Sequence, residues 1–380
     1  MYSILTVNGR IQLRRVRWHC PQQSSEAPAD RLLDAAEETI SRGVCELACR
    51  INQGATSFTQ TAENLWHAAR LKLSQETLRE LIEEEGKAAV RKFQRAEVDR
   101  RWSAEECEVA SGATRVYQGC DGVKVPLVTE EEKRKRRAKV REKRRRCGRK
   151  RRPLPRLKAG ADQAYKEFRV ANFYSETMQN RFVQATSGDC QATGRLMQRM
   201  ALQIHFAEAD EKIANIDGAP WIRNQIELHG VVDAIGLDFY HLRDNVQKAR
   251  RSVFGEASPE GKQWLEEMMH TFRHEGYDAA WNRLVAWRST LRGAKREAAD
   301  RLLQYVAERR AMIRYPEFRR RGWQIGSGPT EAECKTTTHR LKGRGRRWNP
   351  GNAEAMMALA CLQDSRLWDA YWRTPDPAEN

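Results

Sequence analysis

Residues 114–126, TRVYQGCDGVKVP, decide how this sequence is interpreted, because they combine a strand pattern with an acidic turn. Thr, Val and Tyr fill the first part of the stretch, as is typical of strands. We expect the strand to end at Asp121-Gly122, a pair that favours turns. The elements predicted downstream are, in order, strands over 165–173 and 181–187, a helix over 191–206, a short strand over 212–216 ending at Asp217-Gly218, and a candidate fifth strand over 231–239.

This order of elements is that of an RNase H-like α/β domain, in which the first and fourth strands lie side by side and parallel. Asp121 and Asp217 then project together, and each is followed by a glycine that lets the backbone turn away sharply. A helix expected over 330–341 adds a third carboxylate, Glu331. Clustered carboxylates repel one another and bind divalent cations, and oxygen ligands with open coordination positions suit Mg²⁺ or Mn²⁺.

Each acid also has a purely structural interpretation. Asp-Gly is a common turn, so Asp121 and Asp217 taken singly fit a structural role. Glu331 favours the helix dipole, whereas Thr330 with Glu333 fits a capping box and makes Glu333 the structural acid. The order of elements, and not any single acid, therefore favours a two-metal site for phosphodiester cleavage.

The composition favours a multi-domain protein that binds a polyanion, and argues against a membrane protein or a disulfide-rich protein. The 380 residues exceed one ordinary core, and the hydrophobic content of 40% supports two or three domains. The net charge of +17 points to a polyanion, most commonly nucleic acid. The longer apolar stretches are too short to span a bilayer, and no signal peptide is evident at the start. Nine cysteines, an odd and scattered number, do not form a disulfide framework, so we expect a reduced, cytoplasmic protein without membrane partners.

Most of the positive charge lies in one tract, residues 133–152, where fifteen Lys and Arg accompany one acid, Glu142. Such a tract is expected to be extended or mobile until an anion neutralises it. We interpret it as an insertion that binds nucleic-acid backbone, and a solvated or localisation-type tract is the alternative. The candidate contacts within it are Lys133, Arg134, Arg144, Arg145 and Arg151.

The N-terminal third is expected to be mainly helical after an initial hairpin at Asn8-Gly9. Helices are predicted over 30–50, 57–68 and 74–87, with Ser57 and Ser74 as N-caps. The last two helices fit either a helix-turn-helix DNA reader or an ordinary helical pair, because the second carries many glutamates. The cysteines and histidine near this region (His19, Cys20, Cys45 and Cys49) could indicate zinc, but small buried thiols fit better.

Five segments resemble insertion-sequence transposases of the ISKra group, distant relatives of Mutator-like DDE enzymes. They are CDGVKVP, ANIDGAPWI, LDFYHLRDNV, YPEFRRRGWQIGSGPTEAECK and RLKGRGRRWNPGNAEAM, within residues 116–372. The resemblance implies an RNase H-like core with Asp121, Asp217 and Glu331 as metal ligands, and a helical insertion before Glu331. It also implies that Asp238 and His241, in a D-x-x-H signature, lie close to the site, where His241 contacts the scissile phosphate, positions an acid, or packs in the core.

The sequence thus predicts an α/β protein with an RNase H-like core, an all-helical insertion and a mainly helical N-terminal DNA-binding region. Further contacts to double-stranded DNA are expected after the Glu331 helix, at Arg340, Lys342, Arg344, Arg346 and Arg347. We expect a bacterial, nucleoid-associated DNA transposase that acts as a homodimer or larger assembly; a non-catalytic derivative that represses or scaffolds is the alternative. The expected divisions are 1–29 (hairpin remnant), 30–110 (helical, DNA-binding), 111–242 (first part of the core, with a basic insertion over 129–160), 243–321 (helical insertion), 322–372 (rest of the core) and 373–380 (loose tail).

Overall fold

A computed structural model describes residues 2–14, 16, 18–20, 23–26, 39–148, 164–343 and 346–373. The chain forms two compact units: Met1–Asp99 with Lys124–Glu167 and Thr336–Asn380, and Arg100–Val123 with Phe168–Lys335. Among the described helices, none is both long enough and apolar enough to cross a membrane.

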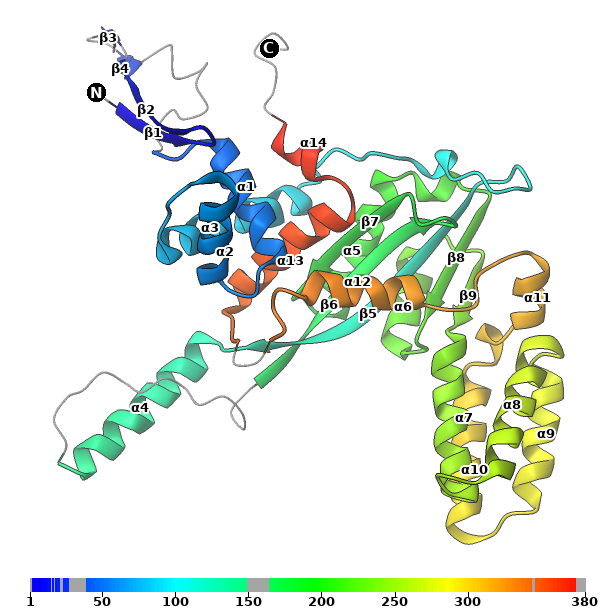
Figure 1. Ribbon diagram of the computed structural model, residues 1–380. Helices are drawn as coiled ribbons and strands as arrows, with labels where there is room; N and C mark the ends of the chain where they lie inside the picture. The colour runs from blue at the N-terminus through cyan, green and yellow to red at the C-terminus, as the bar shows by residue number, and fades with distance from the viewer. Residues whose placement is uncertain are drawn as a thin grey trace. The chain divides into compact units, whose positions relative to one another are not determined.

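The second unit contains a five-stranded sheet with the strand order β7-β6-β5-β8-β9 (Figure 1). β5 pairs in parallel with β8, and β8 in parallel with β9, whereas β6 and β7 are antiparallel. The predicted neighbourhood of the first and fourth core strands is therefore confirmed. The bounds are β5 Arg115–Leu127, β6 Ala164–Ser175, β7 Arg181–Thr186, α5 Cys190–Gln203, β8 Glu211–Ile216, α6 Pro220–His229 and β9 Ala234–Leu237.

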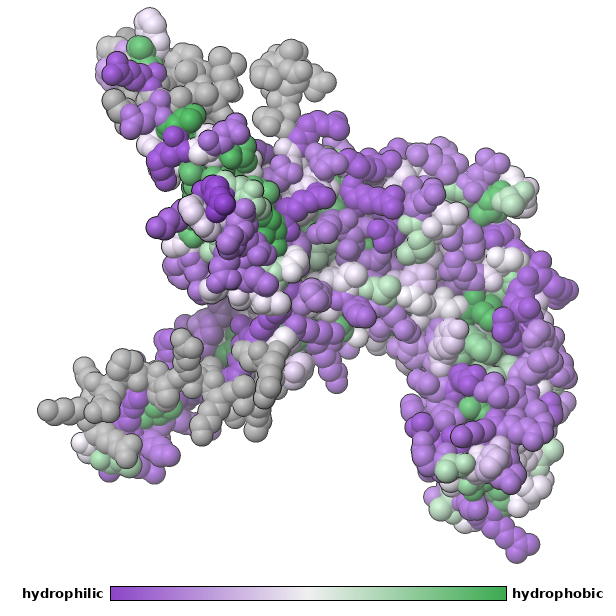
Figure 2. Space-filling model, viewed as in Figure 1, coloured by the Kyte–Doolittle hydropathy of each residue, from purple (hydrophilic) through white to green (hydrophobic). Residues whose placement is uncertain are grey.

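A helical block follows β9, as the sequence predicted. Ser258 caps α8 by accepting a hydrogen bond from the Gly261 amide at 3.0 Å. Trp264 and Trp287 pack against each other with ring centroids 4.2 Å apart. Polar residues cover most of the visible surface over α7–α10 (Figure 2). The bounds are α7 Phe239–Phe254, α8 Pro259–His274, α9 Tyr277–Ser289, α10 Gly293–Glu308 and α11 Tyr315–Arg320.

The helix that carries Glu331, α12 (Gly328–Thr338), lies against β5 at Gly119. A Cβ at Gly119 would overlap Thr330 Oγ1 and Asn172 Oδ1, so only glycine leaves room for this close approach. Thr330 Oγ1 in turn donates a hydrogen bond to Asn172 Oδ1 at 3.0 Å. The predicted capping box of Thr330 and Glu333 is wrong, because the helix begins earlier, at Gly328, and buried Glu333 pairs with Arg181 at 3.5 Å.

The first unit is built around α13 (Pro350–Asp364), whose residues from Ala355 to Leu362 are all buried. α3 packs so closely on it that a Cβ at Gly86 would collide with the Ala355 backbone. The hairpin at Asn8-Gly9 and the caps of Ser57 and Ser74 are confirmed. The bounds are β1 Tyr2–Thr6, β2 Gly9–Leu13, β3 Trp18–Cys20, β4 Gln23–Glu26, α1 Arg42–Gly54, α2 Phe58–Ala69, α3 Gln75–Gln94 and α14 Trp368–Trp372.

The described part of the basic tract is not extended, contrary to our expectation, but forms the helix α4 (Glu130–Arg146). Thr129 and Glu132 form a capping box, and Glu130, Glu131 and Glu132 occupy the first turn, where acids interact favourably with the helix dipole. Lys and Arg are also good helix formers, and Glu130 pairs with Lys133 at 2.7 Å. Local capping thus outweighs the repulsion among the cations. Residues 149–163 lie outside the described part of the chain.

Candidate metal centre

Three aspartates, which we call the acidic row, follow the paired segments of three neighbouring parallel strands. Gln118 of β5 pairs with Ala214 of β8, and continuing this register by three residues places Asp121 opposite Asp217. Ile216 of β8 pairs with Leu237 of β9, so Asp217 is followed in the same register by Asp238. The pairing itself ends at Gln118–Ala214 and at Ile216–Leu237, so this alignment is extended from the register, and the influence of the Asp217 charge on Asp121 places these two acids in one neighbourhood.

The strand ends differ in detail from the prediction. Asp121 does not end β5, which continues to Leu127, although β5 pairs with β8 only up to Gln118. Asp217 directly follows β8 and accepts a hydrogen bond from the Ala219 amide at 2.8 Å. Gly218 has a φ of 85°, a conformation that favours glycine, so the sharp turn expected after Asp217 is present.

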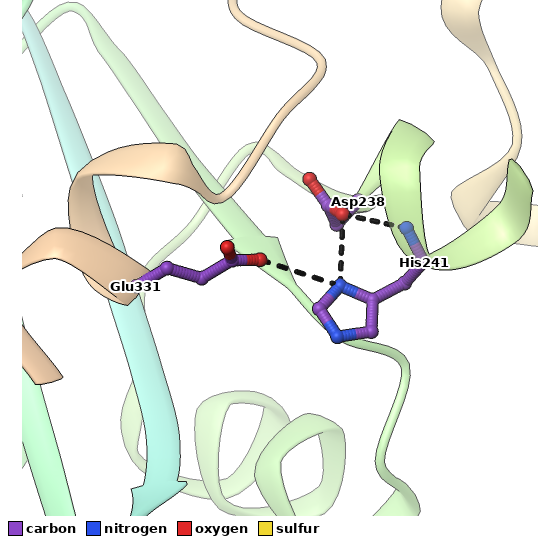
Figure 3. A group of neighbouring side chains, drawn as sticks. All are labelled: Asp238, His241 and Glu331. Carbon is purple, nitrogen blue, oxygen red and sulfur yellow. Dashed lines mark hydrogen bonds and ion pairs between the residues drawn. The ribbon is translucent and has the colours of Figure 1, made fainter. Parts of the chain in front are cut away.

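Glu331 points from α12 towards His241 and Asp238 (Figure 3). The carboxylate of Glu331 lies 3.7 Å from His241 Nδ1, and the same nitrogen lies 2.8 Å from Asp238 Oδ2. The ligand atoms of Asp238, His241 and Glu331 all lie within 4.8 Å of one another. One turn further along α12, Cys334 Sγ lies 4.0 Å from Asp121 Oδ2, so the helix also contacts the first aspartate.

The Gly-rich segment before α12 is held to the edge of the sheet at several points. Phe239 donates its amide to the Ile325 carbonyl at 2.9 Å, and the Ser327 amide donates to Asp238 Oδ1 at 2.6 Å. Further upstream, buried Arg115 donates to the carbonyls of Arg321 and Gly322, both at 2.9 Å. These bonds fix the start of α12 and therefore the position of Glu331.

Asp238 is buried and accepts hydrogen bonds from both His241 and Ser327. Its Oδ2 accepts from the His241 amide at 2.7 Å, which makes it the N-cap of α7. Burial acts to raise its pKa, but hydrogen bonds from the His241 ring and from the Ser327 and His241 amides outweigh burial and lower it. The hydrogen bond to Asp238 raises the pKa of His241 to about 9, so the ring is an imidazolium at neutral pH.

Asp121 shares the electrostatic field of the other site residues. Burial raises its pKa to about 6, with the negative charges of Asp217 and Glu331 acting in the same direction. The Gly122 amide and the positive charge of His241 act against this rise. Clustered carboxylates that destabilise one another's ionised forms are a common feature of cation sites.

The donor set suits a hard divalent cation. Asp238 and Glu331 offer carboxylate oxygens, which are the ligands preferred by Mg²⁺ and Mn²⁺. The predicted ligands Asp121 and Asp217 are not part of this close group. His241 adds a nitrogen once it loses its proton, and metal binding is expected to release that proton. The resemblance to Mutator-like enzymes implied that Asp238 lies near the site, but not that it is a ligand. Its signal was present, because each of the segments YQGCD, ANID and IGLD ends a strand-like run in an aspartate.

A residue of the helical block supports the second aspartate. Arg309 Nε donates to the Gly218 carbonyl at 3.1 Å, directly after Asp217. Its guanidinium lies 4.0 Å from the centroid of the Tyr305 ring. The block is therefore attached to the turn that positions Asp217.

The predicted backbone-binding cations of the first unit occupy different environments. Arg134, Arg145 and Lys342 are exposed, whereas Lys133, Arg144, Arg346 and Arg347 are half-buried. Arg340 is buried with an exposed fraction of 3%, and its guanidinium lies 4.8 Å from the Phe58 ring centroid and 5.2 Å from that of Trp348. It therefore does not lie on an exposed loop, as its Gly-rich surroundings suggested. Arg151 and Arg344 lie outside the described residues.

Comparisons with known proteins add little. No protein-family model and no curated protein matches this sequence. Among solved structures, the Drosophila P element transposase strand transfer complex aligns over 85% of this chain and 79% of that chain. The TM-score is 0.26 and the identity 9%, values too low to assign a fold or a function.

Proposed function

We propose that this chain is a metal-dependent DNA transposase of the DDE type, with an RNase H-like core and a similarity to the ISKra group. The observations that carry the proposal are the close group of Asp238, His241 and Glu331, and the influence of the Asp217 and Glu331 charges on nearby Asp121. The strand order, with two parallel pairs beside an antiparallel pair, is compatible with that core. The basic helix α4 adds affinity for a polyanion.

The site residues would divide the work of DNA strand cleavage and joining. Asp121, Asp217 and Glu331 would hold Mg²⁺ or Mn²⁺, with Asp238 as a further acid. Bound divalent ions activate an attacking oxygen and stabilise the leaving oxygen in phosphodiester chemistry. His241 is oriented through Nδ1 by Asp238, so its Nε2 is directed away from that acid and is suited to contact a phosphate. Because cleavage and joining act on two element ends, we expect a homodimer or larger assembly on DNA.

The test is strand nicking and joining on a plasmid that carries the element's ends, with Mg²⁺ or Mn²⁺ added. Asp121→Asn, Asp217→Asn and Glu331→Gln should each abolish nicking, while Asp278→Asn, an exposed acid of the helical block, should not. Mn²⁺ binding, followed by electron paramagnetic resonance, should weaken in the site variants only. If the three variants nicked DNA at the wild-type rate, the proposed chemistry would be refuted. DNA binding without nicking by the wild-type protein would instead favour a non-catalytic repressor or scaffold.

A further inference from the structure

A cluster of buried side chains joins the sheet of the second unit to the segment that leads to α12. Tyr117 of β5 is the register partner of Ile213 of β8, and its ring stacks on that of Tyr174 of β6 with centroids 5.3 Å apart. The buried members of the cluster are Tyr117, Tyr174, Ile213, Ala234, Phe318 and Trp323. Apolar packing holds the segment against the sheet, but because such packing is not directional, it does not by itself fix where the segment lies along the strands.

Gln324, within this segment, is hydrogen-bonded to three different parts of the sheet. Its amide donates to the Tyr117 hydroxyl at 3.1 Å, and its carbonyl accepts from Asn215 Nδ2 of β8 at 3.1 Å. Its side-chain amide donates at 3.3 Å to Glu176 Oε1, on the residue directly after β6. Hydrogen bonds are directional, so this set of three fixes Gln324 relative to β5, β6 and β8.

The Tyr117 hydroxyl makes two hydrogen bonds at once. It donates to Glu176 Oε2 at 2.7 Å while it accepts from the Gln324 amide. Burial and the bond to Glu176 raise the pKa of Tyr117, so the hydroxyl keeps its proton and remains a donor. The hydroxyl of the stacked Tyr174, by contrast, lies near Asn215 but makes no hydrogen bond of normal geometry. Removal of the Tyr117 hydroxyl would therefore leave the Gln324 amide without its acceptor, a cost that removal of the Tyr174 hydroxyl does not carry.

The network ends beside the close group of Asp238, His241 and Glu331. Ser327 follows Gln324 by three positions, and its amide donates to Asp238 Oδ1 at 2.6 Å. The Ser327 hydroxyl donates to Glu331 Oε1 at 3.4 Å. Ser327 therefore contacts both carboxylates of the group, and a displacement of Gln324 would be passed through the intervening main chain to both.

We infer that Tyr117 and Gln324 are positioning residues of the candidate metal centre, and that they set the separation of Asp238 and Glu331 through Ser327. Neither residue belongs to the close group itself, and both act through the main chain of residues 324–327. The inference rests on the proposed function only in taking this group as a metal centre. It requires neither DNA nor strand cleavage.

The first measurement is hydrogen exchange of the full, metal-free chain, followed by mass spectrometry. Tyr117→Phe removes the hydroxyl and keeps the ring, and it should speed exchange several-fold in peptides that cover residues 324–331. The matched control is Tyr174→Phe, which removes the neighbouring hydroxyl and should leave these peptides unchanged. A general loss of stability would instead speed exchange throughout the second unit, α8 included. Equal exchange over 324–331 in the two variants, or an increase spread evenly over the unit, would overturn the inference.

The second measurement is the affinity for Mn²⁺, followed by electron paramagnetic resonance at a temperature where every variant is folded. Tyr117→Phe should weaken Mn²⁺ binding several-fold, whereas Tyr174→Phe should not. Glu176→Gln keeps an oxygen that accepts from Tyr117 and should retain the affinity, whereas Glu176→Ala should weaken it as Tyr117→Phe does.

The outcomes separate this inference from the proposed function. Wild-type Mn²⁺ affinity in Tyr117→Phe would show that the network does not position the centre, as would Glu176→Gln binding no better than Glu176→Ala. A wild-type chain that bound no Mn²⁺ would also refute the inference. A chain that bound Mn²⁺, and lost affinity in Tyr117→Phe as expected, but did not nick DNA would support the inference and count only against the transposase.

Discussion

The contact between α12 and the sheet at Gly119 allows a quantitative test of how Glu331 is positioned. In Gly119→Ala the new methyl group would overlap Thr330 Oγ1 and Asn172 Oδ1, so α12 must move away from β5. Overpacking of this kind costs about 1–3 kcal/mol. Replacing glycine returns about 0.4–1 kcal/mol through the unfolded chain. We therefore expect a net loss of about 1–2 kcal/mol in the free energy of unfolding.

Urea denaturation measures this loss as a lower midpoint at an unchanged slope. The displacement of α12 should also weaken Mn²⁺ binding, because Glu331 is the first residue after Thr330. Gly351→Ala is the matched control, since a Cβ there meets nothing within 4 Å. Thr330→Ala in the same chain should restore part of the stability of Gly119→Ala by removing the overlapping oxygen. A Gly119→Ala protein with wild-type stability and Mn²⁺ affinity would show that α12 is not fixed by this contact.

Three further predictions concern other parts of the chain. Arg115→Met should lower the free energy of unfolding by about 3 kcal/mol, measured in urea, because it removes the cation that pairs with both Glu176 and Glu211. In the metal-free protein, the stabilisation from the raised His241 pKa is complete below pH 6.5 and lost as pH rises towards 9; screening reduces its size because the side chain is 38% exposed. His241→Gln should remove the decrease in the free energy of unfolding between pH 6.5 and 9. If the decrease persisted in the variant, His241 would not be its cause. Thr129→Ala should increase hydrogen exchange in the first turn of α4 by removing its cap, whereas unchanged exchange would show that the cap does not hold this helix.

The order of strands could be predicted from the sequence because each strand carries a short apolar run with a turn signal. The same reasoning predicted that β5 and β8 are neighbours, and it found Asp217 at the end of β8. It placed the end of β5 too early, because Asp121-Gly122 resembles a turn while the strand continues to Leu127. A turn signal describes local preference only, and pairing along the rest of a long strand overrides it.

Asp238 shows what local patterns leave undetermined. Its alignment with Asp217 depends on the register of β8 and β9, a long-range property that a single segment does not contain. The bonds it accepts from His241 are local, but the bond it accepts from Ser327 depends on a segment 89 positions further along the chain. Asp238 could be found from the D-x-x-H motif, but its contacts with His241 and Ser327 at the site could be seen only in the folded structure.

The basic residues were misjudged for a different reason. Composition suggested that the tract after Thr129 repels itself, yet three glutamates and a capping box are enough to start α4. Arg340 was expected to be a solvated DNA contact because glycines follow it, but it is buried and its guanidinium packs against two aromatic rings, one of them from α2. A count of charges treats a segment as if it were isolated. The predictions for α4 and for Arg340 were both wrong because neighbouring residues, the capping glutamates in one case and the aromatic rings in the other, determine the structure.

The hydrogen bonds that join Phe239 to Ile325 and Asp238 to Ser327 have an architectural consequence. The chain leaves the edge of the sheet after Asp238 and returns beside it at Ile325. The residues between these two points form an inserted helical bundle, and the positions of the acidic residues do not depend on its length. Evolution, or a protein engineer, could therefore lengthen, shorten or exchange the intervening bundle with little effect on the acids. The parts of it that must be retained are the few that reach back, such as Arg309 at Gly218 and the Tyr315 hydroxyl, which donates to the Leu237 carbonyl at 3.0 Å.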